Sequence, residues 1–523
     1  MFSAQLHRYI FLVGTFGLMF GMMVGTATAS IPEIILMSNW LLEGQFKQKW
    51  NQLKSNKIYW SLIAIYLLHL LSVIYSNNLS DAINDLRVKL PLFVLPTVYF
   101  STQSLSKKEL HLALICFIGG VFANTAWCYV FSLVIHQLET VREVSRFMSH
   151  IRLGLFVNLA ILCAIYLMSE LQSIKLKIVL VILIAYFTCM LMALALTAGI
   201  GFLGLIIALG SIILIVKKIQ RKYVLIGLTI LIISILFVGE NLMRFKQELS
   251  TIKESPSNLK LEKTKAGNYF RHDSSHQIES GFIVNMNVNY EEVQNTWNQR
   301  YPNDTFNIPQ QYNLKRFYIL SRYFSSKGLP GEAHSFNLLS EKDYNNILNN
   351  VPNPTYPSWN SMKKRFYELV WDITEYQHGA NINGHSFSMR LHYWEVALSQ
   401  IKKKWLFGYG IGGVNQSMQE GYTSFKTQLD KNWQLRPHQQ FLTITLGLGL
   451  VGLLFFITSL IYPMMVLRKQ LPVIYFVFMV LTLVSFLFED TLETIAGICF
   501  YAVFNSVMLS YIYFNSKQNI TSK

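Results

Sequence analysis

Arg436 and His438 stand together at the start of a long apolar run, 438–467. Imidazole exchanges protons near neutral pH, so a histidine at this position could take a proton from a hydroxyl group. The guanidinium group of arginine stays charged at any relevant pH and matches the oxygens of a phosphate. The pair is therefore a candidate catalytic site. The alternative is an interfacial histidine that hydrogen-bonds to a lipid headgroup.

A second set of basic residues, Arg142, Arg146 and Arg152, lies in a short gap between two apolar runs. The alternation of charge along the chain places this gap outside the cytoplasm, where basic residues are disfavoured. Arg142 and Arg146 are four residues apart and would share one face of a helix. They could pair with Glu139 and Glu143 or with lipid phosphate. The sharper interpretation is an anion site at the outer membrane surface, where a lipid-linked diphosphate would arrive.

A helix is predicted over 389–401, where apolar residues recur at helical spacing. Its apolar stripe consists of Leu391, Trp394, Leu398 and Ile401. Arg390 lies next to this stripe. The glycines that follow, Gly408 and Gly410 among them, indicate a turn after the helix. They are not a dinucleotide-binding fingerprint, because no strand precedes them.

Three acidic residues, Glu489, Asp490 and Glu493, lie between the last two apolar runs. Glu489 and Glu493 are four residues apart and would face the same way on a helix. We interpret the group as the rim of a site, and binding of an acceptor sugar is the alternative. No metal site is predicted, because the helices near the candidate site offer no tight carboxylate cluster. The histidines of the long loop also lack further ligands.

The composition places all of these residues in a membrane protein. Apolar residues make up 52% of the 523 residues and charged residues 14%, whereas a soluble domain carries about 25% charged residues. A soluble enzyme of this size is therefore not expected. Twelve runs approach the roughly 20 apolar residues that cross a bilayer. These runs are 7–27, 29–43, 58–75, 88–101, 110–136, 152–169, 178–196, 199–216, 223–240, 438–467, 471–488 and 494–514.

Lys and Arg cluster in every second gap between these runs, which predicts twelve membrane helices with both termini in the cytoplasm. The net charge of +16 mostly records this orientation, so nucleic-acid binding is not predicted. We expect an all-α polytopic membrane protein. Its parts are an N-terminal membrane domain of about nine helices over 1–240, a large external loop over 241–437 that carries the Arg-, Trp- and Gly-rich segment 388–413, and a C-terminal membrane domain of about three helices over 438–523.

In order and spacing these pieces resemble the O-antigen ligase and polymerase family of bacterial cell-surface polysaccharide synthesis. Three motifs carry the resemblance: Arg390 through Trp394, the turn Trp405-Leu-Phe-Gly-Tyr-Gly-Ile-Gly412, and His438-Gln-Gln-Phe-Leu442 with the following Gly447, Gly449 and Gly452. Trp405 stands where the family usually has Pro, and Gln439 stands in place of Asn. A family Ser-Arg-Gly segment has no arginine counterpart in 196–201, so another arginine would have to supply that anion contact.

The resemblance implies a metal-independent, inverting glycosyltransferase with a GT-C-like architecture and no cofactor. The implied donor is a glycan on undecaprenyl diphosphate, and the acceptor is lipid A–core or another glycan. The reaction would take place on the outer face of the bacterial inner membrane, among membrane lipids, with the large loop in the periplasm. His438 is then the catalytic residue. Arg390, Arg146, Arg142 and Arg436 would bind the diphosphate, and Trp394, Gly408, Gly410, Gln439 and Glu489 would hold the acceptor or the motif itself.

O-antigen ligase is the favoured activity within this family. An O-antigen or exopolysaccharide polymerase and a protein O-oligosaccharyltransferase share the same motifs and remain alternatives. A transporter or flippase is a further alternative, although the long loop in a single gap breaks the symmetry of related halves that transporters often show. A receptor whose loop captures a surface glycan without chemistry also remains open.

Overall fold

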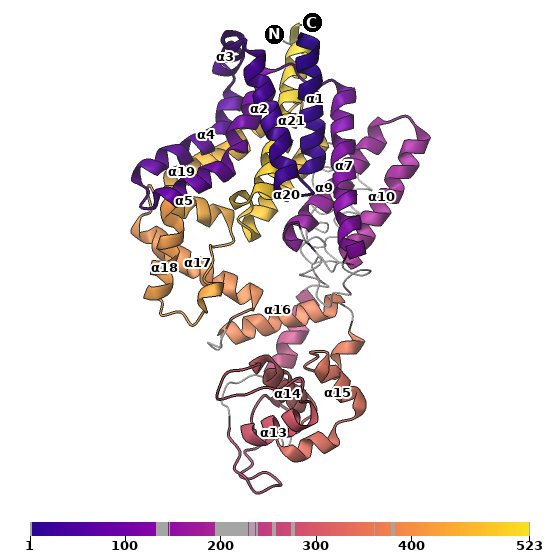
Figure 1. The fold of residues 1–523 in the computed structure, drawn as a ribbon, viewed down its shortest axis with the longest axis vertical. Helices are drawn as coiled ribbons and strands as arrows, with labels where there is room; N and C mark the ends of the chain where they lie inside the picture. The colour runs from indigo at the N-terminus through magenta and orange to yellow at the C-terminus, as the bar shows by residue number, and fades with distance from the viewer. Residues whose placement is uncertain are drawn as a thin grey trace. The chain divides into compact units, whose positions relative to one another are not determined.

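The computed structural model describes residues 3–131, 145, 147–193, 229, 236, 239–253, 258–272, 278–359, 361–377 and 382–521. These residues are mostly helical and contain little sheet, as expected for an all-α protein (Figure 1). The chain forms two compact units. The first unit consists of Met1–Ile232, Arg390–Thr427 and Gln434–Lys523, and the second consists of Ile233–Met389 and Gln428–Trp433.

The first unit contains the apolar helices and several shorter, more polar ones. Their bounds are α1 (Ala4–Gly21), α2 (Thr26–Glu43), α3 (Phe46–Lys54), α4 (Lys57–Ser72), α5 (Leu79–Lys89), α6 (Pro91–Ser101), α7 (Lys107–Tyr129), α9 (His150–Glu170), α10 (Ile174–Ala193), α18 (Val414–Ser424), α19 (Gln440–Val466), α20 (Val473–Phe488) and α21 (Ile495–Thr521). Three 3₁₀ turns join them, namely η1 (Val73–Tyr75), η6 (Ile411–Gly413) and η8 (Thr491–Glu493). The helix α17 (Ser386–Lys403) begins in the second unit and enters the first at Arg390.

Six helical segments among the described residues are long and apolar enough to cross a membrane, so the protein is a multi-pass membrane protein. They are Lys57–Tyr75, Lys107–Tyr129, His150–Glu170, Ile174–Leu191, Gln440–Val466 and Ile495–Lys517. The helix α20 is apolar but shorter. The expected spans 199–216 and 223–240 lie outside the described residues, apart from a few positions near 240. The total of twelve spans therefore stays a prediction.

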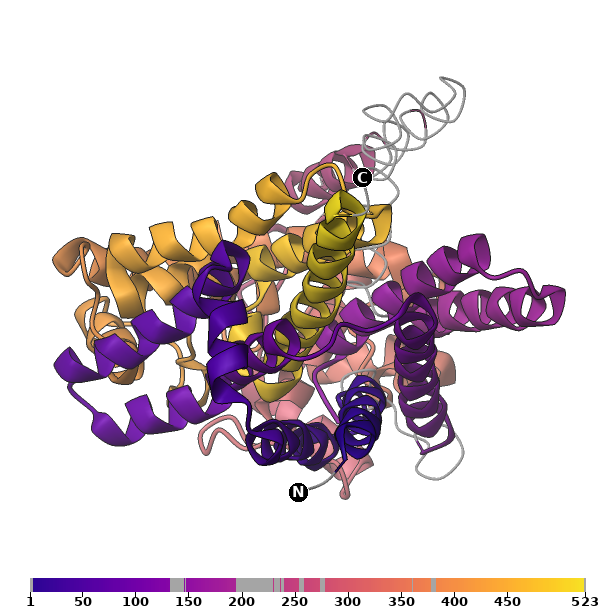
Figure 2. The same ribbon diagram turned by 90° about the horizontal axis from the view of Figure 1, so that it is seen from above.

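The core of the first unit is built around α6 and α21, which pack against each other. Nearly every side chain of α6 is buried, and α6 opens on Pro91, whose missing N–H is not needed in a first helical turn. Around this pair, α4 packs against α19, and α1 packs between α2 and α7 (Figures 1 and 2). The start of α1 and the end of α21 lie at the same end of the unit (Figure 1).

The second unit is a small helical body with a two-stranded antiparallel hairpin. Its elements are β1 (Ile278–Glu279), β2 (Phe282–Ile283), α13 (Tyr290–Arg300), α14 (Leu314–Ser326), η4 (Ala333–Leu338), α15 (Glu341–Leu348), η5 (Tyr356–Ser358), α16 (Ser361–Gln377) and the first turn of α17. An apolar cluster around Trp297 and Tyr323 fills its interior. The hairpin is tied to α14 by a buried ion pair, because Arg322 donates two hydrogen bonds of 2.8 and 2.6 Å to the Glu279 carboxylate.

We expect Glu279→Gln to destabilise the second unit. Glu279 is fully buried, and its loss leaves the charge of Arg322 without a counter-ion, which costs about 3–5 kcal/mol for a buried pair. Proteolysis of this unit during a temperature ramp of the detergent-purified protein measures the loss. Glu341→Gln is the matched control, because its pairing with Arg300 is solvent-exposed and contributes little. Equal effects of the two changes would contradict the assignment.

Candidate functional site

The predicted glycine turn follows α17 and docks on a break in α19. Gly449 has a φ of +67° and interrupts the helix. The break interrupts the helical hydrogen-bond pattern at this point of α19. The turn pairs with four backbone groups on the two sides of the break: the N–H groups of Tyr409 and Gly410 donate to the carbonyls of Leu446 and Gly447 (2.9 Å each), and the N–H groups of Leu450 and Val451 donate to the carbonyls of Trp405 and Leu406 (2.8 and 3.3 Å).

This docking requires glycine at three positions. Gly408 and Gly410 both have positive φ, as Gly449 does, and positive φ strains any residue with a Cβ. A Cβ on Gly408 would also lie 2.6 Å from the backbone of Gly447, and one on Gly449 would lie 2.1 Å from the carbonyl oxygen of Leu406. The glycines therefore allow two backbone segments to touch. They do not form a phosphate cradle.

The same turn reaches α4 on its other side. The N–H groups of Ile411 and Gly412 donate to the hydroxyls of Ser72 and Ser76, at 3.3 and 3.1 Å. A Cβ on Gly410 would lie 2.3 Å from the Ser76 hydroxyl, so this contact is also close. The turn thereby links α19 to the end of α4 and fixes the segment that leads into α18.

His438 precedes α19 in a strained backbone conformation, with a φ of +50°. Gln439 follows it as the N-cap of α19, and its side-chain oxygen accepts a hydrogen bond from the N–H of Leu442 at 2.6 Å. The side chain of Gln439 therefore caps the start of α19. Nδ1 of His438 lies 3.6 Å from a Glu489 oxygen and 3.4 Å from an Asp490 oxygen. Left-handed conformations in residues other than glycine concentrate at functional sites.

Two carboxylates control the protonation of His438. Burial favours the neutral ring, but the nearby Asp490 and Glu489 outweigh it and raise the pKa of His438 to about 9. The ring is therefore a cation at neutral pH. The three side chains present ligand atoms within 4.8 Å of one another, a spacing that could hold a metal ion. The absence of a metal stays a prediction.

The helix α17 braces this group from one side. Nη2 of Arg390 donates to the Glu489 carboxylate at 2.6 Å. One turn further along, the indole N–H of Trp394 donates to the carbonyl of Pro437 at 3.0 Å. The two residues are four apart, so a single helix face fixes both a carboxylate beside the imidazole and the backbone that precedes His438.

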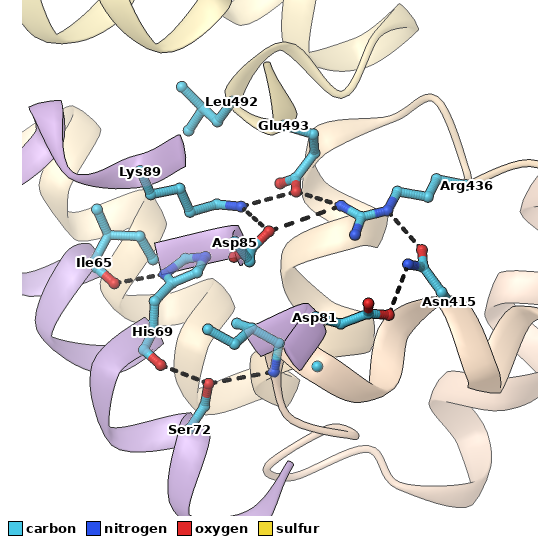
Figure 3. A network of polar contacts seen from close by, with 12 residues as sticks. Ile65, His69, Ser72, Asp81, Asp85, Lys89, Asn415, Arg436, Leu492 and Glu493 are labelled. Carbon is cyan, nitrogen blue, oxygen red and sulfur yellow. Dashed lines mark hydrogen bonds and ion pairs between the residues drawn. The ribbon is translucent and has the colours of Figure 1, made fainter. Parts of the chain in front are cut away.

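A second cluster of charges surrounds Arg436 (Figure 3). Its guanidinium contacts the Glu493 carboxylate at 2.5 Å and the Asn415 side-chain oxygen at 2.9 Å. Glu493 also accepts from Nζ of Lys89 at 2.8 Å, and Lys89 donates to Asp85 at 2.7 Å. Lys89 is 1% exposed, so this network of two cations and two carboxylates is buried and balanced in charge.

The two carboxyls of this network differ in acidity. Burial alone would raise the pKa of Glu493, but Lys89 and Arg436 outweigh it and hold that pKa well below its usual range. Burial raises the pKa of Asp85, and only part of this effect is offset by Lys89. Glu493 is thus the more acidic of the two carboxyls, and it anchors Arg436.

The sequence suggested that the acidic residues form the rim of a site, but the structure buries them. Glu489 and Asp490 are each 4% exposed, because they pair with Arg390 and His438. Glu489 and Glu493 also do not share a helix face. The helix α20 ends at Phe488, so Glu489 lies in extended backbone and Glu493 in the turn η8.

A cavity of about 330 Å³ opens beside these groups. It is lined by Asp81, Asn84, Asp85, Val88, Arg152, Asn415, Leu435, Arg436, His438, Asp490, Glu493 and Thr494. Arg152 lies in the first turn of α9, and its buried Nε has no hydrogen-bond partner. No described acidic residue forms an ion pair with it. Every other cation named at the site already contacts a carboxylate.

The predicted site residues that the structure describes fall into three groups. The structure brings His438, Arg390, Trp394, Gln439 and Glu489 together at the start of α19, places Arg436 in the neighbouring charge cluster, and uses Gly408 and Gly410 to dock the turn. Arg142, Arg146 and 196–201 lie outside the described residues. Arg152 belongs to the external basic set that the sequence indicated as an anion site, although only Arg142 and Arg146 of that set were assigned to the diphosphate. Its position at the start of an apolar run, like that of Arg436, is the signal that distinguishes it.

We expect Gly449→Ala to prevent the turn from docking. The new Cβ would overlap the carbonyl of Leu406 at a positive φ, where strain alone costs about 1–3 kcal/mol. The yield of monodisperse protein and its thermal unfolding midpoint should both fall. Gly119→Ala is the control. Gly119 lies within α7, where alanine is favoured over glycine, and its new Cβ would lie 3.9 Å from the Phe20 side chain. An unaltered midpoint in Gly449→Ala would contradict the docking.

Comparison with known proteins identifies one family in this part of the chain. A family model described as O-antigen ligase matches residues 354–457. The matched segment contains Arg390, Trp394, the glycine turn, Arg436 and His438. No curated protein matches the chain. The resemblance that the motifs indicated is therefore confirmed over this segment.

Proposed function

We propose that this membrane protein, which carries an O-antigen ligase domain over residues 354–457, moves a glycan from a polyprenyl-diphosphate donor to an acceptor hydroxyl. The observation that carries the proposal is the cavity shared by His438 and the unpaired Arg152, at the start of apolar helices. A group that handles a proton and a free guanidinium that binds an anion meet there. Among the activities of this family we favour O-antigen ligase with lipid A–core as acceptor, ahead of a polymerase or a protein O-oligosaccharyltransferase.

Arg152 is the first contact that we propose for the diphosphate. Its guanidinium has no ion pair among the described residues, so anion binding does not require an existing contact to break. Arg390 and Arg436, together with Arg142 and Arg146 as predicted from the sequence, complete the binding of the leaving group. Their positive charges stabilise the charge that develops on the diphosphate as the glycosidic bond breaks. Attack from the opposite side inverts the anomeric centre.

His438 is the proposed base for the acceptor hydroxyl. Its carboxylate neighbours orient the ring, and they also keep it protonated at neutral pH. Only the neutral fraction of His438 can accept the proton, and this fraction grows as the pH rises towards about 9. In the alternative mechanism, Asp490 is the base and His438 remains a cation. That mechanism predicts no rise in the rate as His438 loses its proton.

The orientation of the protein follows from the charge pattern of the sequence. We propose that the site faces the outer side of the bacterial inner membrane, with 241–437 in the periplasm and both termini in the cytoplasm. The common location of the start of α1 and the end of α21 supports an even number of spans (Figure 1). We also propose that transfer needs no metal, so a chelator should leave the rate of transfer unchanged.

The activity is tested by glycan transfer in proteoliposomes that contain polyprenyl-diphosphate-linked donor and acceptor. We expect His438→Ala and Arg152→Gln each to lower the rate by about 100-fold or more, as loss of a transition-state contact does. Arg468→Gln is the matched control, because Arg468 is exposed and lies outside the cavity. Donor movement without a new glycosidic bond would instead identify a transporter. Full activity of both site variants would contradict the proposed chemistry.

The pH dependence of transfer tests the base. We expect the rate to rise from neutral pH to about 9, where His438 loses its proton. Asp490→Asn removes the nearer carboxylate, lowers the pKa of His438 and should shift the rise to lower pH. Rates at several pH values for both proteins measure this shift. A pH-independent rate in the native protein, or a shift to higher pH in the variant, would exclude His438 as base.

A further inference from the structure

One wall of the cavity is a single face of α5. Asp81, Asn84, Asp85 and Val88 line the cavity at positions i, i+3, i+4 and i+7, which is the spacing of one helix face. Neither the proposed base nor the proposed diphosphate contacts use these side chains. Three of the four carry hydrogen-bond acceptors, and Asn415 adds another amide group to the same lining.

The negative charge of this face is only partly balanced. Asp85 and Glu493 are neutralised by Lys89 and Arg436, and Asp490 lies beside the cationic His438. Asp81 has no ion pair among the described residues, and it accepts one hydrogen bond, of 3.2 Å, from the amide of Asn415. The cavity therefore combines a free guanidinium, Arg152, with a free carboxylate, Asp81.

Asp85 provides the second observation. It is 9% exposed, and its Oδ1 accepts from Lys89, but its Oδ2 is buried without a hydrogen-bond partner. A buried acceptor that lacks a donor is costly, and a ligand hydroxyl is a donor that would satisfy it. Neutral hydroxyl groups suit such a carboxylate, whereas another carboxylate would be repelled.

We propose that the α5 face binds the acceptor sugar ring that carries the attacking hydroxyl, and that it selects rings without a carboxylate. Hydroxyl groups of a neutral hexose would donate to Asp81 and Asp85 and exchange hydrogen bonds with Asn84 and Asn415. With Arg152 occupied by the donor diphosphate, a uronic acid ring would bring its carboxylate against Asp81 and be disfavoured by like-charge repulsion. The choice of the acceptor ring rests on the proposed function, because His438 lines the same cavity.

Binding can be tested without any transfer. Saturation-transfer-difference NMR on the detergent-purified full-length protein, with inorganic pyrophosphate present to occupy Arg152, would compare the methyl glycosides of glucose, galactose and mannose with those of the matching uronic acids. We expect at least one neutral glycoside to bind about tenfold more tightly than its uronic acid counterpart. Asp81→Asn should reduce this preference, and Asp81→Lys should abolish or reverse it. Equal binding of the paired glycosides, or no binding of any neutral one, would overturn the proposal.

A matched control variant separates a local effect from a change in overall charge. Glu420→Lys makes the same change in charge on the exposed face of α18, outside the cavity, and should leave the preference unaltered. A loss of preference in Glu420→Lys equal to that in Asp81→Lys would count against the α5 face.

Transfer assays distinguish failure of this inference from failure of the proposed function. Equal transfer to acceptors that end in a neutral hexose and in a uronic acid would refute the selectivity while the transferase stands. Discrimination against uronic acid only in the donor would refute the assignment to the acceptor ring. A binding preference that depends on Asp81, in a protein that transfers nothing, would support the sugar site and refute the transferase.

Discussion

The site depends on one opened turn of α19. The helix is broken at Gly449, and four backbone groups beside the break pair with the turn at 405–410. Beside apolar helices, an unpaired backbone group costs several kcal/mol, so turn and helix form together or not at all. The helix start that carries His438, the end of α4 and the entry to α18 are all fixed by this contact.

Charge pairing adds the second level of order. Each acidic residue near the start of α19 is buried against a cation from another part of the chain: Glu489 against Arg390, Glu493 against Lys89 and Arg436, and Asp490 against His438. Buried pairs of this kind contribute little net stability, but they penalise any arrangement that separates the partners. Separating one of these side chains from its partner would therefore cost much free energy, so the side chains of the site are held in one arrangement. Arg152 is the exception, because no described acidic residue forms an ion pair with it and its buried Nε has no hydrogen-bond partner.

Properties encoded by neighbouring residues were predictable. The apolar runs predicted α4, α7, α9, α10, α19 and α21, because hydropathy acts over consecutive positions. The order of Arg390, the glycine turn and His438 indicated the family, whose match covers these residues. Contacts across long separations were not predictable. The residues around Gly408 do not indicate that it packs against the backbone of Gly447. Likewise, the sequence of α5 does not indicate that this helix lines the same cavity as His438. The apolar run correctly ended at 488, but the residues after it do not show that the backbone there is extended, so the sequence wrongly put Glu489 and Glu493 on one helix face.

The protonated state of His438 links occupancy of the site to proton uptake. With the ring charged, the ionised groups in the cavity wall, together with Lys89 behind it, sum to no net charge: four carboxylates face three fixed cations and the imidazolium. Under the proposed function, a donor diphosphate bound in this cavity would raise the pKa of His438 further, since a nearby anion favours the charged ring. By thermodynamic linkage that donor would bind more tightly as the pH falls, whereas proton removal from the acceptor would be favoured as the pH rises. Binding and chemistry thus make opposite demands on one proton.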